Sequence, residues 1–222
     1  MRTDHRRQGE TCRDRWRKIG VFGGSFNPVH NGHLQIAKAA MECMELSEVW
    51  FIPAGDPYMK QSREMLPARE RLRLTRLAVQ NIRGFSVDPI ETQREGASYT
   101  VDTLEELAGR HPDCRFYLIV GEDAFSQMPL WKSPERILKL SELIVAGRKS
   151  GADVPVYDTA PLPVPDEKLH RIALDIDISS TMIRRRILHG ESITGMVPEN
   201  AEEEIRKSFE RFFEKQAEEM KQ

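Results

Sequence analysis

The sequence contains few cysteines, no long apolar run and almost no net charge. Its three cysteines, Cys12, Cys43 and Cys114, form no C-x-x-C pair, which argues against a disulfide framework and against a zinc ribbon. No run approaches the ~18 apolar residues of a membrane helix, and the charged N-terminus has no apolar core for secretion. The formal net charge is -2, so no basic field indicates nucleic acid or a membrane surface as a partner. We expect a soluble, cytoplasmic protein that binds small molecules.

Two common nucleotide-binding fingerprints are absent as well. The sequence has no G-x-x-x-x-G-K-[ST] loop, in which a lysine would hold nucleotide phosphates, and no G-x-G-x-x-G turn. The sequence therefore gives no support for a P-loop enzyme or for a dinucleotide-dependent oxidoreductase.

Strands and helices alternate along the chain. Short β-branched or apolar runs predict strands, and apolar residues spaced three and four apart predict helices. Five or six strands alternating with helices predict an α/β fold, in which a doubly wound parallel sheet is covered on both faces. The expected strands are 18–24, 48–54, 85–90, 115–121, 142–147 and 169–174, and the expected helices begin at 31, 67, 100, 122, 134, 178–180 and 199.

The stretch GVFGGSFNPVHNGHL follows the first strand and leads into a helix. Gly23 and Gly24 allow close approach of an anion to the backbone, and Asn31 is expected to cap the helix. His30 and His33 lie in the first helical turn, where both imidazoles can face one phosphate. Two alternatives stay open: ordinary residues at a helix start, or a zinc pair, although no third Cys or His ligand is near.

A second polar stretch, ISSTMIR, begins the helix near Ile178. Its hydroxyls can cap free N–H groups, while Arg184 lies one turn further on and faces the same end. Taken alone, this pattern is typical of an N-cap followed by a surface cation. Combined with the histidine stretch, it indicates a second group of phosphate ligands.

Together the two stretches resemble the nucleotidylyltransferases that carry an H-x-G-H signature near the N-terminus and an I-S-S-T-x-[IV]-R signature near the C-terminus. Within this superfamily the chain is most similar to the bacterial nicotinate mononucleotide adenylyltransferases. The similarity extends over about residues 18–198 and includes VWFIPAG, REGASYTVDTL, YLIVGEDAF, Trp131 and ISSTMIR.

The resemblance implies a Rossmann-like nucleotidylyltransferase fold and direct attack of the mononucleotide phosphate on the α-phosphorus of ATP. Mg²⁺ would assist, and no covalent intermediate would form. Transfers of this kind depend on positioning and charge stabilisation. The implied catalytic residues are His30, His33 and Arg184. The implied ATP-binding residues are Gly23, Gly24, Ser25, Phe26, His30, His33, Gly121, Asp123, Ile178, Ser180, Thr181 and Arg184.

For the nicotinate mononucleotide acceptor, the resemblance points to Thr100 and to the backbone around Trp131. Lys132 follows this tryptophan where relatives often have an aromatic residue. Lys60 and Arg148 are candidate cations for the acceptor phosphate. Structural alternatives remain open for these residues, because Trp131 can be a lid or core aromatic and the cations can be plain surface charges.

Other departures and alternatives concern the whole chain. Pro-Tyr-Met-Lys replaces the Pro-Pro-His-Lys of many relatives, and Asn27 stands where Asp is frequent. We expect a flexible tail over 1–17, one nucleotidylyltransferase domain over 18–198 and a helix over 199–222 packed on it; whether the chain forms a homo-oligomer stays open. The alternatives are an adenylyltransferase that prefers or also uses nicotinamide mononucleotide, a phosphopantetheine adenylyltransferase, and a non-catalytic nucleotide sensor.

Overall fold

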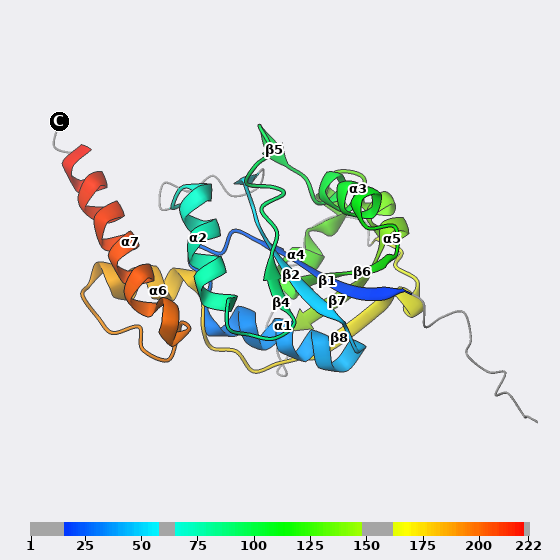
Figure 1. Ribbon diagram of the computed structural model, residues 1–222, viewed down its shortest axis with the longest axis horizontal. Helices are drawn as coiled ribbons and strands as arrows, with labels where there is room; N and C mark the ends of the chain where they lie inside the picture. Colours follow the sequence, from blue (N-terminus) through cyan, green and yellow to red (C-terminus); the bar gives the residue numbers. More distant parts are fainter. Residues whose placement is uncertain (1–15, 58–64, 148–161, 220–222) are drawn as a thin grey trace, which may run out of the picture.

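The protein folds around a single six-stranded parallel sheet with helices on both faces (Figure 1). A computed structural model describes residues 16–57, 65–147 and 162–219. The strand order is β4-β2-β1-β6-β7-β8, and every neighbouring pair in this sheet is parallel. From β1 the chain builds the sheet in one direction, and from β6 it builds in the other. The order therefore reverses between β1 and β6, which is where open α/β sheets bind their ligands.

The elements follow the predicted order with small shifts at their ends. The main strands are β1 (Arg17–Gly24), β2 (Glu48–Pro53), β4 (Phe85–Val87), β6 (Cys114–Gly121), β7 (Ser141–Gly147) and β8 (Leu169–Ala173). The helices are α1 (Asn31–Met44), α2 (Ala68–Val79), α3 (Thr100–Arg110), α4 (Glu122–Ser126), α5 (Pro134–Leu140), α6 (Ser180–Leu188) and α7 (Glu199–Glu219).

A second, two-stranded sheet was not predicted. It pairs β3 (Asp56–Pro57) with β5 (Ala97–Ser98) inside segments that sequence periodicity assigned to loops. Two-residue strands carry no period-two pattern of their own, so the pattern could not find them. The helix after Gly121 ends at Ser126 and is followed by a short 3₁₀ helix (Met128–Leu130), and the strand that begins at Phe85 already ends at Val87.

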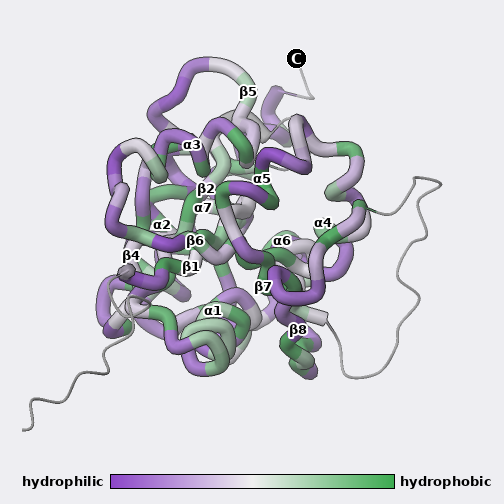
Figure 2. Tube along the Cα trace, turned by 90° about the vertical axis from the view of Figure 1, so that its right-hand side faces the viewer, coloured by the Kyte–Doolittle hydropathy of each residue, from purple (hydrophilic) through white to green (hydrophobic). Residues whose placement is uncertain are grey.

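The two faces of the sheet bury two separate apolar clusters. Along β1, Ile19 and Val21 face the cluster under α3 and α5, whereas Phe22 faces the cluster under α1, α2, α6 and α7. Figures 1 and 2 show α1 on one side of the sheet and α3 and α5 on the other. This alternation is the period-two signature of a strand that is covered on both faces.

The last helix, α7, packs on α2 and α6 (Figure 1). Ile205 and Phe209 are fully buried in the cluster on the α1 face of the sheet. On α2, Glu70 accepts a hydrogen bond from the Ser208 hydroxyl of α7 (2.6 Å), and Arg73 forms an ion pair with Glu204 (3.0 Å). None of the helices within the described ranges is long and apolar enough to cross a membrane.

Candidate active site

The first group of predicted ATP-binding residues lies at the point where the strand order reverses. Gly23 and Gly24 end β1, and Gly121 ends the neighbouring strand β6. Both strands point their carboxyl ends toward the same edge of the sheet, where α1 begins. Backbone N–H groups and a helix N-terminus at such an edge favour phosphate binding.

The loop between β1 and α1, residues 25–30, is folded inward and anchored on both sides. Phe26 has a positive φ of 44° and is only 1% exposed, packing against Phe22 and Phe51. The side-chain oxygen of Asn27 accepts a hydrogen bond from the backbone N–H of Leu66 (3.0 Å), and the Asn27–Pro28 bond is cis. Where relatives often have Asp, Asn27 still supplies the oxygen that this bond needs.

His30 and His33 lie face to face at the start of α1. Their ring centroids are 3.7 Å apart, and the His30 backbone N–H donates to His33 Nδ1 (3.2 Å). His30 is 6% exposed, and its Nδ1 is buried without a hydrogen-bond partner among the described residues. Burial lowers the pKa of His30 to about 4, so this imidazole is neutral at physiological pH.

The residues between the two histidines explain why the rings can meet. His30 itself occupies the N-cap position of α1, so the expectation that Asn31 caps the helix is wrong. The Asn31 amide instead donates to the carbonyls of Gly195 (2.9 Å) and Val197 (3.2 Å). At Gly32, a Cβ would lie 2.7 Å from Ile176 Cγ2 and 3.0 Å from His30 Nδ1, so only glycine fits.

The ISSTMIR stretch reaches the same loop from α6. The Ser180 hydroxyl donates to the Pro28 carbonyl (2.8 Å), and Arg184 donates to the Asn27 carbonyl (3.0 Å). Arg184 also donates to the Thr181 hydroxyl (3.3 Å). The N-cap of α6 is Ser179, whose hydroxyl oxygen accepts from the Met182 N–H (3.2 Å). Two motifs about 150 residues apart therefore form one unit, which we call the ATP-phosphate region (residues 23–33 and 178–184).

Other predicted ATP-binding residues occupy the rim of this region. The Ser25 carbonyl accepts a hydrogen bond from Arg71 of α2 (2.7 Å), and Ile178 packs against the cluster on the α1 face. Gly121 is the N-cap of α4 with open space where a Cβ would be, and Asp123 is exposed in the first turn. These positions are accessible at the carboxyl end of β6.

The predicted acceptor residues Thr100, Trp131 and Lys132 form a second group, which we call the acceptor region. Thr100 is the first residue of α3 and is half-buried. The side chain of the half-buried Trp131 packs against the cluster under α3 and α5, and the backbone N–H of Trp131 donates to the Met128 carbonyl (3.0 Å). The structure thus bears out a core aromatic at this position, while contact of Trp131 with the acceptor stays a prediction.

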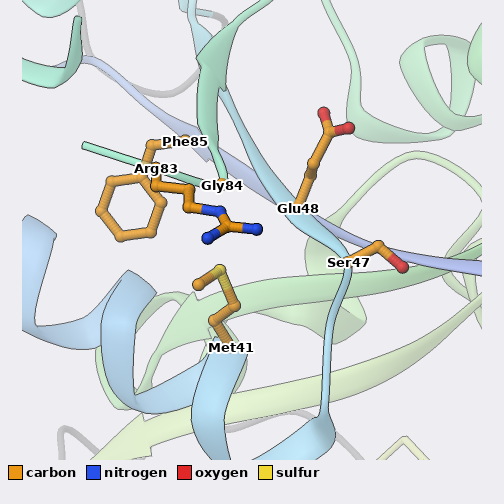
Figure 3. Close-up of a pocket in the computed structure, with 6 residues that line it drawn as sticks. All are labelled: Met41, Ser47, Glu48, Arg83, Gly84 and Phe85. Carbon is orange, nitrogen blue, oxygen red and sulfur yellow. The ribbon is translucent and has the colours of Figure 1, made fainter. Parts of the chain in front are cut away.

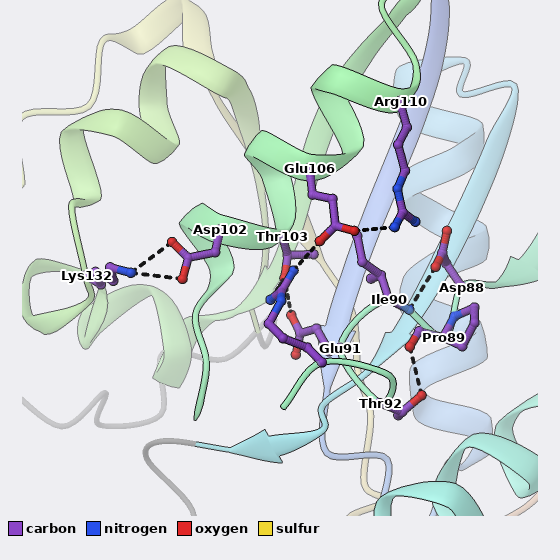
Figure 4. Close-up of polar contacts among 11 residues, drawn as sticks. Asp88, Pro89, Ile90, Glu91, Thr92, Asp102, Thr103, Glu106, Arg110 and Lys132 are labelled. Atoms are coloured by element: carbon purple, nitrogen blue, oxygen red, sulfur yellow. Dashed lines mark hydrogen bonds and ion pairs between the residues drawn. The ribbon is translucent and has the colours of Figure 1, made fainter. Parts of the chain in front are cut away.

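Lys132 already has partners on α3. Its ammonium group donates to both carboxylate oxygens of Asp102 at 2.9 Å, as Figure 4 shows, and lies 4.5 Å from the centroid of the Tyr99 ring. The structure therefore directs this cation toward α3. The two remaining candidates, Lys60 and Arg148, lie outside the described residues.

Comparison with known proteins identifies the family. A model of the cytidylyltransferase-like family matches residues 21–186. A nicotinate-nucleotide adenylyltransferase of Geobacillus thermodenitrificans is 39% identical over 184 residues, which cover 82% of this chain and 80% of that protein. The chain belongs to this adenylyltransferase family. A second member, from Exiguobacterium sibiricum, is 40% identical over 182 residues, covering 82% of this chain and 92% of its own.

Comparison with solved structures finds the same fold as in an adenylyltransferase. The Plasmodium falciparum nicotinic acid mononucleotide adenylyltransferase complexed with NaAD superimposes with a TM-score of 0.66, covering 86% of this chain and 95% of that one. At 18% identity the likeness concerns the fold alone. The predicted doubly wound sheet is confirmed.

Two buried charged residues near the site were not predicted. Arg71 on α2 is 1% exposed, and Glu91, between β4 and β5, is 9% exposed. Arg71, Leu74, Thr75 and Ala78 are all buried at the spacing of one helix face. An arginine on that apolar stripe was the available signal, since arginine is rarely buried without a specific set of partners.

A separate pocket of about 550 Å³ lies at the other end of the sheet (Figure 3). It opens beside the first residues of β2 and β4, whereas the candidate active site lies at the carboxyl ends of the strands. Glu48 at its edge is already paired with Arg17 and accepts from the Trp50 indole (2.8 Å). Its lining residues are Met41, Ser47, Glu48, Arg83, Gly84 and Phe85.

Proposed function

We propose that this chain transfers the adenylyl group of ATP to nicotinate mononucleotide, giving nicotinate adenine dinucleotide and pyrophosphate. The ATP-phosphate region supports this function most directly. It combines a stacked histidine pair, of which His30 is buried and neutral, with a helix N-terminus and an arginine around one loop at the reversal of the strand order. These groups suit phosphate binding and the stabilisation of charge during transfer.

In the proposed reaction, a phosphate oxygen of the mononucleotide attacks the α-phosphorus of ATP. A new P–O bond forms to this oxygen, and the bond from the α-phosphorus to the bridging oxygen breaks as pyrophosphate leaves. Because His30 is neutral, it acts as a hydrogen-bond donor to a phosphate oxygen and needs no proton transfer. Arg184 and the hydroxyls of Ser180 and Thr181 hold the departing phosphates.

Magnesium is proposed to arrive with ATP as part of the substrate. The described residues contain no cluster of three or more His, Cys, Asp or Glu side chains that could hold a metal ion. This fits Mg²⁺, which keeps several waters and binds through substrate phosphates with few protein ligands. It would neutralise phosphate charge.

We also propose a cytoplasmic location, with neither nucleic acid nor membrane as a partner.

The acceptor is the part of the function that most needs a test. We expect kcat/KM for nicotinate mononucleotide to exceed that for nicotinamide mononucleotide by at least about 10²-fold. The resemblance points to the Thr100 hydroxyl and to backbone N–H groups near Trp131, other than that of Trp131 itself, which donates to Met128. Such donors favour a carboxylate over an amide whose NH₂ would leave them unpaired. Each unpaired buried group costs about 1–3 kcal/mol.

Steady-state rates of pyrophosphate release with ATP, Mg²⁺ and each mononucleotide measure this ratio. Phosphopantetheine serves as a third acceptor, and ATP without acceptor gives the background. Equal efficiency with both mononucleotides would contradict the assignment and favour a dual-specificity enzyme. Binding of ATP without transfer to any of the three would instead indicate a nucleotide sensor.

A further inference from the structure

The guanidinium of Arg71 is buried at the junction of three loop segments. It donates from Nη1 to the Ser25 carbonyl (2.7 Å), from Nη2 to the Gly55 carbonyl (3.0 Å) and from Nε to the Leu66 carbonyl (2.9 Å). Among the described residues, no carboxylate lies within ion-pair distance of it. Its hydrogen bonds are thus made entirely to backbone, at fixed directions set by the planar guanidinium.

The three carbonyls belong to separate segments around the phosphate loop. Ser25 is in this loop after β1, Gly55 follows the end of β2, and Leu66 precedes α2. Leu66 is held twice, because its N–H donates to the side-chain oxygen of Asn27 in the same phosphate loop.

The position of Gly55 shows how little freedom this junction has. A Cβ at Gly55 would lie 2.1 Å from the carbonyl oxygen of Glu91, so the two backbones touch and no larger residue fits. The Glu91 carboxylate accepts from the Thr103 hydroxyl of α3 (2.8 Å), as Figure 4 shows, and Arg94 donates to the same hydroxyl (3.1 Å). The junction therefore continues from α2 to α3, the helix that begins with Thr100.

The charge of Arg71 adds a second effect. Burial lowers its pKa to about 10, and the nearby Glu91 opposes this shift, so the guanidinium stays protonated at neutral pH. A positive charge directly beneath the phosphate loop favours anions bound above it.

We propose that Arg71 is a positioning residue for adenylyl transfer, whose guanidinium fixes the phosphate loop relative to Gly55 and, through the contact of Gly55 with Glu91, relative to α3, in the orientation that aligns the two substrates. This inference rests on the proposed function. If it holds, replacing the fork by a single ammonium loosens the alignment while both substrates still bind. A displacement of about 1 Å in such an alignment can cost up to about 10²-fold in rate.

The test compares Arg71→Lys with Arg76→Lys, a matched change at an exposed arginine on the same helix. We expect Arg71→Lys to lower kcat per folded molecule about 10- to 100-fold, with KM for ATP and for nicotinate mononucleotide changed by less than about threefold. Arg76→Lys should keep the wild-type values. The folded fraction is measured by thermal melting at the assay temperature, so that a loss of folded protein is not counted as a loss of rate.

Several outcomes would overturn the inference. An unchanged kcat per folded molecule in Arg71→Lys would limit Arg71 to a stabilising role, and so would failure of both Arg71→Lys and Arg71→Gln to fold. Failure of the proposed function itself is recognised separately, because the wild type and Arg76→Lys would then also lack transfer to nicotinate mononucleotide.

Discussion

The ATP-phosphate region and the acceptor region are built in different ways. In the first, hydrogen bonds from Ser180 and Arg184 end on backbone carbonyls of one loop, so distant segments hold each other. In the second, Thr100 begins α3, Trp131 and Lys132 follow each other in the segment before α5, and the lysine pairs with Asp102 of α3. In our proposal, phosphate is recognised by a compact, backbone-fixed unit, whereas the base is met by separate side chains, of which Trp131 also packs against the core.

The largest expected effect would break the compact region from within. We expect His30→Ala and His33→Ala each to lower kcat by about 10²- to 10³-fold, the loss typical of removing one preorganised transition-state donor. Steady-state kinetics per folded molecule measure this. His189→Ala, at an exposed histidine that follows α6, is the control. A variant at full rate would remove that histidine from the mechanism.

A smaller effect concerns the pH dependence of stability. Below pH 6.5 the unfolded chain protonates His30, whereas the folded chain does so only near pH 4, so acid favours the unfolded state. Stability is full above pH 6.5 and falls as the pH drops from 6.5 to 4. At pH 5 the loss amounts to about 2 kcal/mol.

Denaturant unfolding of the wild type and of His30→Gln at pH 7 and pH 5 checks this prediction. The variant should lose less stability than the wild type between the two pH values, by about the same 2 kcal/mol. His189→Gln should keep the wild-type difference. Equal losses in the wild type and His30→Gln would show that His30 is not held neutral by burial.

The smallest effect would sharpen the contrast from the acceptor side. Because Lys132 is paired with Asp102 at the surface, Lys132→Met should change stability by less than about 1 kcal/mol and KM for nicotinate mononucleotide by less than about threefold. Lys139→Met, at an exposed lysine of α5, is the control. A tenfold rise in KM confined to Lys132→Met would show that the lysine leaves Asp102 for the substrate.

The same contrast explains what the sequence could predict. The sheet and its helices follow from apolar periodicity, because burial on one or two faces imposes it residue by residue. The two histidines lie in one short motif, where local geometry brings their rings together. Arg184 reaches the same loop from a second motif 157 residues beyond Asn27, and it was predicted only because both motifs resemble those of one family. The pairing of Lys132 with Asp102 joins α3 to a segment 30 residues on, and no local pattern encodes such a contact. Arg71 was missed because the apolar periodicity of α2 predicts buried apolar side chains, and an arginine at one of these positions looks like a surface residue.

The cap of α1 was assigned wrongly for a related reason. Asn is a stronger capping residue than His, so intrinsic preference pointed to Asn31. In the fold, the Asn31 amide is taken by the carbonyls of Gly195 and Val197, which approach from beyond α6. Tertiary contacts thus displaced the start of the helix by one residue, and this shift is what places His30 at its first turn.

Helix α7 links two helices, α2 and α6, that lie far apart in the sequence. Its buried half is wedged against both α2, which carries Arg71, and α6, which carries Arg184, while Figure 1 shows its last turns running out from the body. Residues 214 and 215 and residues 217 to 219 are exposed there. A fluorophore attached on these turns would report a change in the position of α7 relative to α2 and α6, the helices that carry Arg71 and Arg184. A change of that kind on addition of ATP would be visible as a shift in the fluorescence.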